Sequence, residues 1–251
     1  MQLLRTCIES IYECTIYPNF EILVYSNACK DGTVDYLKQL SQEKENIEFI
    51  FSSENEVYVT PNNKLMEIAG DNNVVLLNND VTVTMGWLSH LIHAGRLIPK
   101  AGIVGAKVLF PDGSLQEFGN EIYVDGQGSN IGKYDDPNKE IYNTISSVSY
   151  VSGCCMYIKR TTLDLIGSFD VSFSPCYFED SDLCYSAWEH DLATIVTHKC
   201  IVVHKEGATA GTDESLGFKK YQSINREKFL SKHKESIDYV NRKSRNYNVE
   251  I

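Results

Sequence analysis

Two side chains that follow short apolar runs could bind a divalent cation together. Asp80 comes after the apolar run at residues 74–77 and two asparagines, and His204 follows Val202 and Val203. Hard cations such as Mg²⁺ and Mn²⁺ prefer carboxylate oxygens and take further ligands from phosphate and water, and imidazole is a common metal ligand. Asp80 and His204 are therefore candidate metal ligands.

A second group of candidates is the acidic cluster of Glu179, Asp180 and Asp182, which opens a predicted helix. Carboxylates crowded together raise the pKa of at least one member, which suits a general base that works near neutral pH. The cluster is therefore a candidate catalytic group.

Each candidate also has a purely structural interpretation. Asn78, Asn79 and Asp80 form a common turn sequence, and acidic residues in the first turn stabilise a helix through its dipole. A lone histidine such as His204 more often serves as a structural hydrogen-bonding residue. Taken one at a time, the structural interpretation is the better one for all three.

Alternating apolar runs predict the elements that would position these side chains. Helical spacing from residue 3, resumed at 34–40, alternates with short apolar runs at 20–25, 47–51 and 74–77, and further strands are predicted at 102–110, 148–158, 193–196 and 200–203. This alternation predicts an α/β fold with a mainly parallel sheet flanked by helices and a small mixed subregion. Ligands bind beyond the carboxyl ends of such strands, where Asp80 and His204 fall.

Length, charge and cysteine content limit the classes of protein to which this chain can belong. The 251 residues are 43% hydrophobic and carry a net charge of −11, which argues against a nucleic-acid partner. The eight cysteines form no Cys-x-x-Cys pair and no apolar leader is evident, so we expect reduced thiols and a cytoplasmic protein. No apolar run reaches the roughly 20 residues of a membrane span.

The basic C-terminal tail is distinct from the rest of the chain. We expect a first domain at 1–215, with halves divided near residue 100, and a helical extension at 216–251 with a net charge of +5 from residue 219 onward. The tail could touch an anionic membrane surface peripherally. A solvated helix packed on the domain is the simpler interpretation.

The order of several motifs resembles family two glycosyltransferases of the GT-A fold. The matching segments are residues 26–33, 77–80, 153–154, 167–170, 179–184 and His204. No single segment is specific, but their joint order spans nearly the whole chain. The family's first buried strand, which precedes a helix equivalent to residues 3–12, has no counterpart here, although its neighbours depend on its hydrogen bonds.

The resemblance implies a role for each matching residue. Asp80 and His204 would bind Mn²⁺ or Mg²⁺, and Asp180 would be the catalytic base. Residues that would contact the nucleotide sugar are Ser26, Asn27, Asp31, Asn62, Asn78 and Asn79. Residues that would border the acceptor are Gly153, Cys154, Glu179 and Asp182.

The resemblance also implies an activity and its partners. The chain would transfer a sugar from a UDP- or dTDP-sugar to a hydroxyl of a glycan or lipid-linked acceptor, with inversion, in bacterial surface polysaccharide or glycoconjugate synthesis. One alternative is a catalytically silent GT-A domain that serves as a scaffold, in view of the absent strand. Another is a nucleotidyltransferase, which would need a glycine-rich phosphate loop that the sequence lacks.

Overall fold

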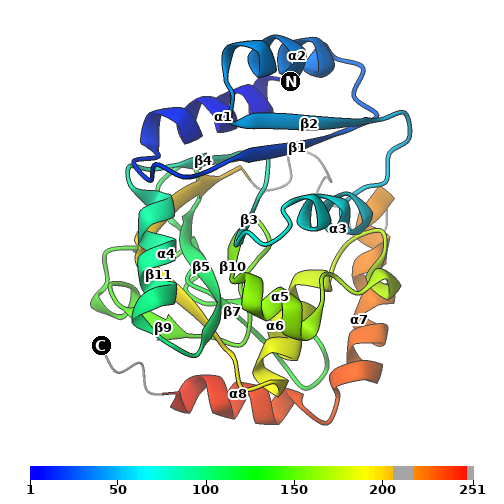
Figure 1. Cartoon of the computed structure of the whole chain (residues 1–251). Helices are drawn as coiled ribbons and strands as arrows, with labels where there is room; N and C mark the ends of the chain where they lie inside the picture. The colour runs from blue at the N-terminus through cyan, green and yellow to red at the C-terminus, as the bar shows by residue number, and fades with distance from the viewer. Residues whose placement is uncertain (206–216, 248–251) are drawn as a thin grey trace.

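The computed structural model describes residues 1–205 and 217–247 and shows an α/β fold (Figure 1). Its helices are α1 (Gln2–Cys14), α2 (Thr33–Glu43), α3 (Val59–Ile68), α4 (Trp87–Leu97), α5 (Arg160–Ile166), α6 (Glu179–Glu189), α7 (Lys220–His233) and α8 (Ile237–Asn246). Its strands are β1 (Ile22–Asn27), β2 (Ile47–Ser52), β3 (Val74–Leu77), β4 (Val81–Val83), β5 (Ala101–Leu109), β6 (Leu115–Glu117), β7 (Asn120–Ile122), β8 (Gly128–Asn130), β9 (Ile145–Ser147), β10 (Cys155–Ile158) and β11 (Ala193–His204).

The main sheet has seven strands, five of them in the order β3-β10-β5-β11-β4, with β6 on β5 and β9 on β11. Strand β10 is antiparallel to both β3 and β5, and β5 is parallel to β11. The three strands β3, β5 and β11 therefore point the same way, as expected, and β10 enters between two of them. The two late strands predicted at 193–196 and 200–203 form one strand, β11, with a shift of register between Thr197 and Ile201.

Helices cover both faces of this sheet, and β5 shows the pattern most clearly. Val104 packs in a cluster with Leu91 of α4, whereas its neighbour Ile103 packs in another cluster with Leu163 of α5 and Leu183 of α6. Successive side chains of a strand point to opposite faces, so β5 is buried on both sides. This explains why residues 101–109 are apolar at every position except Lys107 rather than alternating.

Strands β1 and β2 form a separate parallel pair, packed between α1 and α2 on one side and α3 on the other (Figure 1). Among the described residues, β1 is paired only with β2, and β3 only with β10. Ile22 and Ala28 donate to the β2 side, so Leu23 and Tyr25 direct their backbone groups to the other edge. Within the described residues, strand pairing is thus interrupted between β1 and β3.

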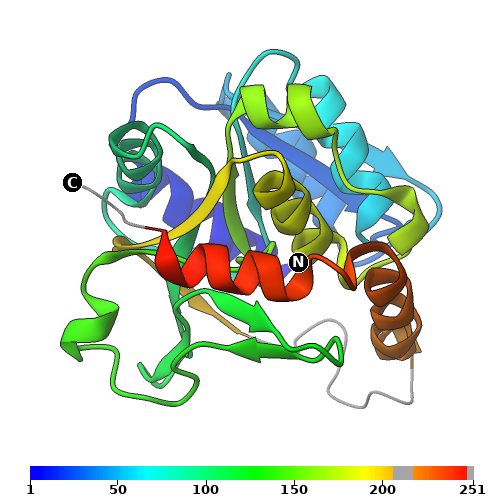
Figure 2. The same cartoon turned by 90° about the horizontal axis from the view of Figure 1, so that it is seen from below.

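The C-terminal helices pack on the domain. Helix α8, red in Figure 2, lies against α6 and β7, and α7 packs against the segment before α6. Phe229 of α7 is fully buried. The domain boundary expected at residues 215 and 216 lies outside the described residues.

Two compositional expectations concern cysteines and membrane spans. All eight cysteines are free in the structure, as expected for a reduced protein. Within the described part of the chain, no helix has the length and apolar character needed to span a bilayer.

Candidate active site

The structure brings Asp80 and His204 together. Strand β4 is antiparallel to β11, with Val81 opposite His204, and this register places the two side chains at one end of the sheet. His204 Nε2 lies 3.2 Å from Asp80 Oδ1, and the side chains are only 12% and 8% exposed. Two residues more than a hundred positions apart therefore share one half-buried location.

Gln116 of β6 fixes the imidazole of His204. His204 Nδ1 lies 3.1 Å from Gln116 Oε1, and with the amide in this orientation Nδ1–H donates to the amide oxygen. In the neutral imidazole Nε2 then has a free lone pair. Nε2 lies beside the carboxylate of Asp80, so either a proton on Nε2 or a cation beside both groups would stabilise this contact.

These two groups fit a divalent cation that is completed by other ligands. The described residues contain no group of three or more histidine, cysteine or acidic side chains that could hold a metal. Asp80 and His204 would supply two ligands, and Mg²⁺ and Mn²⁺ commonly take the rest from phosphate and water. The hydrogen bond from Nδ1 to Gln116 is the kind of outer contact that orients a metal-binding histidine.

Asp180 reaches the same region through the backbone of Gly153 and Cys154. The amide of Gly153 donates to Asp180 Oδ2 at 3.1 Å, and the carbonyl of Cys154 accepts from the amide of Asn78 at 3.0 Å. Asn78 in turn accepts from the amide of Val81, across the turn that carries Asp80. Short hydrogen-bonded steps thus connect the predicted base to the Asp80 and His204 pair.

Gly153 is a point of close approach. A Cβ atom built there would lie 2.6 Å from the hydroxyl of Tyr58, which donates to the carbonyl of Gly153 at 3.1 Å. Any side chain at this position would therefore displace Tyr58. The predicted importance of Gly153 has a steric basis in the structure.

The acidic cluster has perturbed protonation. Burial raises the pKa of Asp180, and hydrogen bonds from Gly153 and Ser181 oppose that rise. Burial and the charge of Asp180 raise the pKa of Glu179 well above its usual range. Glu179 Oε2 has no hydrogen-bond partner among the described residues, which is consistent with a carboxyl that stays protonated beside an ionised Asp180.

Asp182 turns away from this group. Its side chain is 5% exposed and lies 2.8 Å from both Lys232 and His233 of α7. Both contacts belong to the packing of α7 on α6. The acceptor contact that the resemblance implies for Asp182 stays a prediction, and the structure gives this carboxylate a different set of partners.

The residues expected to contact the nucleotide sugar lie in several places. Ser26 is buried at the end of β1, and its hydroxyl has no partner within residues 1–205 and 217–247. Asn27 uses both ends of its amide on the loop after β2, donating to the carbonyl of Val57 at 2.9 Å and accepting from the amide of Glu56 at 2.7 Å. Asn27 therefore holds the backbone of that loop.

The other predicted nucleotide-sugar residues are also described. Asp31 is exposed between β1 and α2 and is bound by the N-terminal ammonium group and by Thr33, at 2.6 Å, and the hydrogen bond from that ammonium group is the main reason its pKa falls to about 2. Asn62 donates to the carbonyl of Tyr58, at 2.9 Å, within α3. Asn79 is exposed beside Asp80.

Sequence reasoning missed Tyr58, Gln116 and Glu117. Gln116 and Glu117 are polar residues in a buried strand, 3% and 6% exposed, and this burial is visible only in the folded chain. Burial raises the pKa of Glu117 to about 7; the charge of Asp180 adds to this rise, while Asn120 and His204 oppose it. Asn130 donates to Glu117 Oε2 at 3.1 Å. Glu117 is therefore a second buried acid within electrostatic range of Asp180 and His204.

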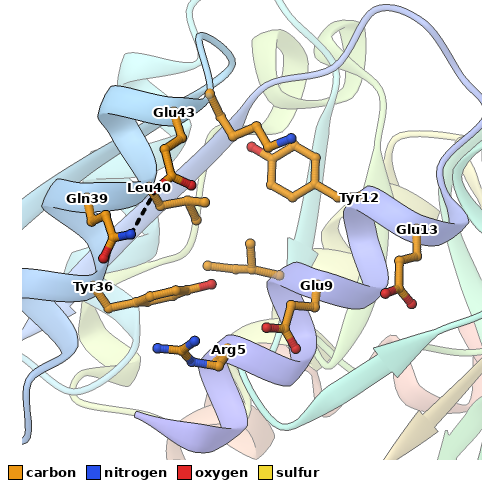
Figure 3. A pocket seen from close by; sticks show the side chains of 10 residues that line it. Arg5, Glu9, Tyr12, Glu13, Tyr36, Gln39, Leu40 and Glu43 are labelled. Atoms are coloured by element: carbon orange, nitrogen blue, oxygen red, sulfur yellow. Dashed lines mark hydrogen bonds between the residues drawn. The ribbon is translucent and has the colours of Figure 1, made fainter.

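A separate hollow of about 310 Å³ lies between α1 and α2 (Figure 3). Arg5 covers the ring of Tyr36 and Lys44 covers the ring of Tyr12, at 4.5 and 4.9 Å from the ring centres. None of Asp80, Asp180 and His204 lines it. The hollow is not part of the candidate site.

Comparison with known proteins gives consistent matches. The family described as "Glycosyl transferase family 2" matches residues 2–166. The chain is 28% identical over 222 residues to the O-antigen biosynthesis protein RfbC of Myxococcus xanthus, covering 84% of this chain and 17% of that protein. It is 24% identical over 214 residues to an N-acetylglucosaminyl-diphospho-decaprenol L-rhamnosyltransferase of Mycobacterium tuberculosis, covering 76% and 68%.

Solved structures share the fold. A crystal structure of GalNAc-T7 with UDP, GalNAc and Mn²⁺ aligns with a TM-score of 0.62 and 12% identity, over 79% of this chain and 40% of that one. An identity this low supports the fold alone, and the GT-A architecture expected from the sequence is confirmed. The chain spans 24% and 17% of the length of the first two curated relatives that it matches.

The buried carboxyl of Glu117 should make stability depend on pH. Its pKa rises from 4.5 to about 7 on folding, so the folded state keeps a proton that the unfolded state loses as pH increases. The favourable contribution is complete below pH 4.5 and is lost as pH rises through 7. Relative to the wild type, Glu117→Gln should gain ~1–3 kcal/mol of unfolding free energy between pH 4.5 and pH 8.

Urea unfolding at the two pH values measures this change. Glu48→Gln, at an exposed position of β2, is the matched control and should show no such gain. Equal pH dependence for Glu117→Gln and the wild type would contradict the burial argument.

Proposed function

The chain belongs to glycosyl transferase family 2, and from that membership we propose that it transfers a sugar from a nucleotide diphosphate sugar to an acceptor hydroxyl. The observation that carries the proposal is the convergence of Asp80, His204 and Asp180 at one end of the main sheet. Asp80 and His204 lie 3.2 Å apart, and Gly153 and Cys154 connect them to Asp180. A catalytically silent scaffold would not need a buried carboxylate and imidazole that meet in this way.

In this proposal Asp180 is the base. Its Oδ2 is held by the amide of Gly153 and its Oδ1 by the amide of Ser181, at 3.1 and 2.7 Å. Above its raised pKa the carboxylate accepts the proton of the acceptor hydroxyl while that oxygen bonds to the anomeric carbon, and the bond to the nucleoside diphosphate breaks. A single displacement of this kind inverts the anomeric configuration.

Asp80 and His204 would hold a divalent cation. When bound, Mn²⁺ or Mg²⁺ neutralises the charge of the leaving diphosphate. Gln116 would keep the lone pair of His204 Nε2 directed toward that ligand position. The Mn²⁺ present in the GalNAc-T7 structure supports this assignment for the shared fold.

We propose a UDP- or dTDP-sugar as donor and a glycan or lipid-linked acceptor, in surface polysaccharide or glycoconjugate synthesis. The names of the two relatives support this class: one is an O-antigen biosynthesis protein and the other is named for a diphospho-decaprenol acceptor. A screen of nucleotide sugars for hydrolysis with Mn²⁺ would identify the donor. If UDP and dTDP do not bind with Mn²⁺ in calorimetric titration, the scaffold alternative is favoured.

Replacement of the proposed base should remove transfer and spare binding. Asp180→Asn keeps the size of the side chain but cannot accept the proton, so we expect kcat to fall by ~10²- to 10⁴-fold. The affinity for UDP with Mn²⁺ should stay within about threefold, because Asp180 is not a proposed ligand of the metal or the nucleotide. Unchanged turnover in Asp180→Asn would assign the base elsewhere.

Loss of Asp80 should remove metal-dependent binding of the nucleotide. Asp80→Ala removes one of the two proposed metal ligands, so we expect UDP binding in Mn²⁺ to fall to the level that the wild type shows in EDTA. Asp71→Ala, at an exposed site near β3, is the control and should bind as the wild type does. Calorimetry with and without Mn²⁺ gives the comparison, and metal-dependent binding that survives in Asp80→Ala would refute the assignment.

A lipid-linked acceptor would require contact with a membrane surface. Phe218 and Ile224 remain 37% and 46% exposed near the start of α7, beside Lys219 and Lys220. We expect sedimentation with vesicles of phosphatidylglycerol but not of phosphatidylcholine, and weaker sedimentation after Lys219→Glu and Lys220→Glu. Equal binding to the two kinds of vesicle, or no binding to either, would exclude this peripheral contact.

A further inference from the structure

Asp180 sits at a point where the backbone takes an unusual course. Tyr177 and Phe178, directly before α6, have φ values of 76° and 71°, in the left-handed region that non-glycine residues rarely adopt. Such residues persist where surrounding contacts hold them, and they gather at functional sites. What holds this turn therefore bears on where the carboxylate of Asp180 lies.

Helix α7 supplies the contacts on one side of the turn. Asn225 is fully buried, and the two N–H groups of its amide are shared among the carbonyls of Phe173, Cys176 and Tyr177, which lie 2.6, 2.9 and 3.0 Å from the nitrogen. Phe229, one turn further along α7, packs on the ring of Phe178 with centres 5.4 Å apart. The turn before Asp180 is thus fastened to α7 by both polar and apolar contacts.

Helix α7 also holds α6 just after Asp180, through a buried charge cluster. His233 is 1% exposed; its Nε2 lies 2.8 Å from Asp182 Oδ1 and its Nδ1 lies 2.9 Å from Glu189 Oε1. Ionised carboxylates only accept hydrogen bonds, so both ring nitrogens carry protons and His233 is an imidazolium. Lys232 adds a second cation 2.8 Å from Asp182.

We propose that His233 is a positioning residue for the catalytic centre, acting from α7 through Asp182 on Asp180, and this rests on the function proposed above for Asp180. Asp182 lies half a turn beyond Asp180 on the same helix, so its hydrogen bond to His233 fixes the rotation and height of the first turn of α6. That placement keeps Asp180 Oδ2 within reach of the amide of Gly153. The imidazolium also neutralises a carboxylate that otherwise adds negative charge to the cluster.

The charge balance of the cluster makes this role measurable. The charged groups around His233 are Asp182 and Glu189 of α6 and Lys232 of α7, and Lys232 also contacts Asp170 at 2.8 Å. Burial on its own would lower the pKa of His233, but the hydrogen bonds to Asp182 and Glu189 outweigh it and raise that pKa. If the imidazolium is removed, Asp182 keeps a less compensated negative charge near Asp180, and ionisation of Asp180 becomes harder.

The first test is His233→Gln, measured with the nucleotide sugar that the donor screen identifies. We expect kcat to fall 10- to 100-fold, because a displaced base loses its alignment with the acceptor. KM for the donor should stay within about twofold, since Asp80 and His204 lie on other elements. The acid limb of the pH profile of kcat/KM should move to higher pH, a change that a general loss of stability would not produce.

The second test is a rescue. In the double variant Asp182→Asn and His233→Gln, two neutral amides replace the charged pair, so the hydrogen bond can re-form without an uncompensated charge. We expect kcat to recover to within about fivefold of the wild type and the acid limb to return, a non-additive result that requires the two residues to act together. His190→Gln, at the exposed end of α6, is the matched control and should change kcat by less than twofold.

Circular dichroism and UDP binding with Mn²⁺ check that each variant is folded. If His233→Gln does not fold, Lys232→Gln takes its place, since Lys232 is 40% exposed and contacts the same Asp182. It should shift the acid limb in the same direction and lower kcat about two- to fivefold.

The outcomes separate the two proposals. Full kcat and an unshifted acid limb in the folded variants, or a double variant that shows no recovery, would overturn the positioning role while Asp180→Asn still abolishes transfer. A wild-type chain that binds UDP and Mn²⁺ but transfers no sugar, with Asp180→Asn indistinguishable from it, would overturn the proposed function and the positioning role together.

Discussion

The site depends on one close contact: Asp80 Oδ1 and His204 Nε2 are held 3.2 Å apart in a place that water reaches poorly. Gln116 fixes the imidazole, and the pairing of β4 with β11 fixes the backbones, so neither partner can turn away. A carboxylate this poorly hydrated is stabilised by a hydrogen-bond donor or a positive charge beside it. The main sheet is the frame of the site. Gly153 and Cys154, directly before β10, connect Asp180 to the turn that carries Asp80.

Much of this frame could be predicted from the sequence, because apolar runs and their polar ends carry the information. The apolar run at 74–77 forms β3 with the predicted bounds, and the polar residues that follow it place Asp80 at the end of the sheet. His204 closes β11 for the same reason, and the acidic residues open α6 as expected. The α/β class and the GT-A architecture followed from the alternation of elements and from the resemblance.

What could not be predicted are contacts created by chain crossings. Gln116 and Glu117 reach the site because β6 folds back on β5, and Tyr58 does so because α3 lies near Gly153, and no local pattern encodes either approach. The strand predicted at 148–158 is regular only from Cys155, as β10; before it, Tyr150 forms an isolated bridge with Asn120, and the amide of Gly153 donates to Asp180. The resemblance implies a nucleotide-sugar contact for Asn27 and an acceptor contact for Asp182. In the folded chain Asn27 also holds the loop after β2 and Asp182 contacts α7, which the sequence did not indicate.

The interruption between β1 and β3 has a mechanical consequence. Ladder hydrogen bonds resist sliding between strands, whereas packed helices shift by small displacements at low cost. The β1–β2 layer is joined to the rest of the fold through helices, with α1 packed on β4 and α3 packed on the segment before α6. Ser26 lies on that layer and Asp80 on the main sheet. A ligand that touches both would therefore contact two layers that no strand pairing joins within the described residues.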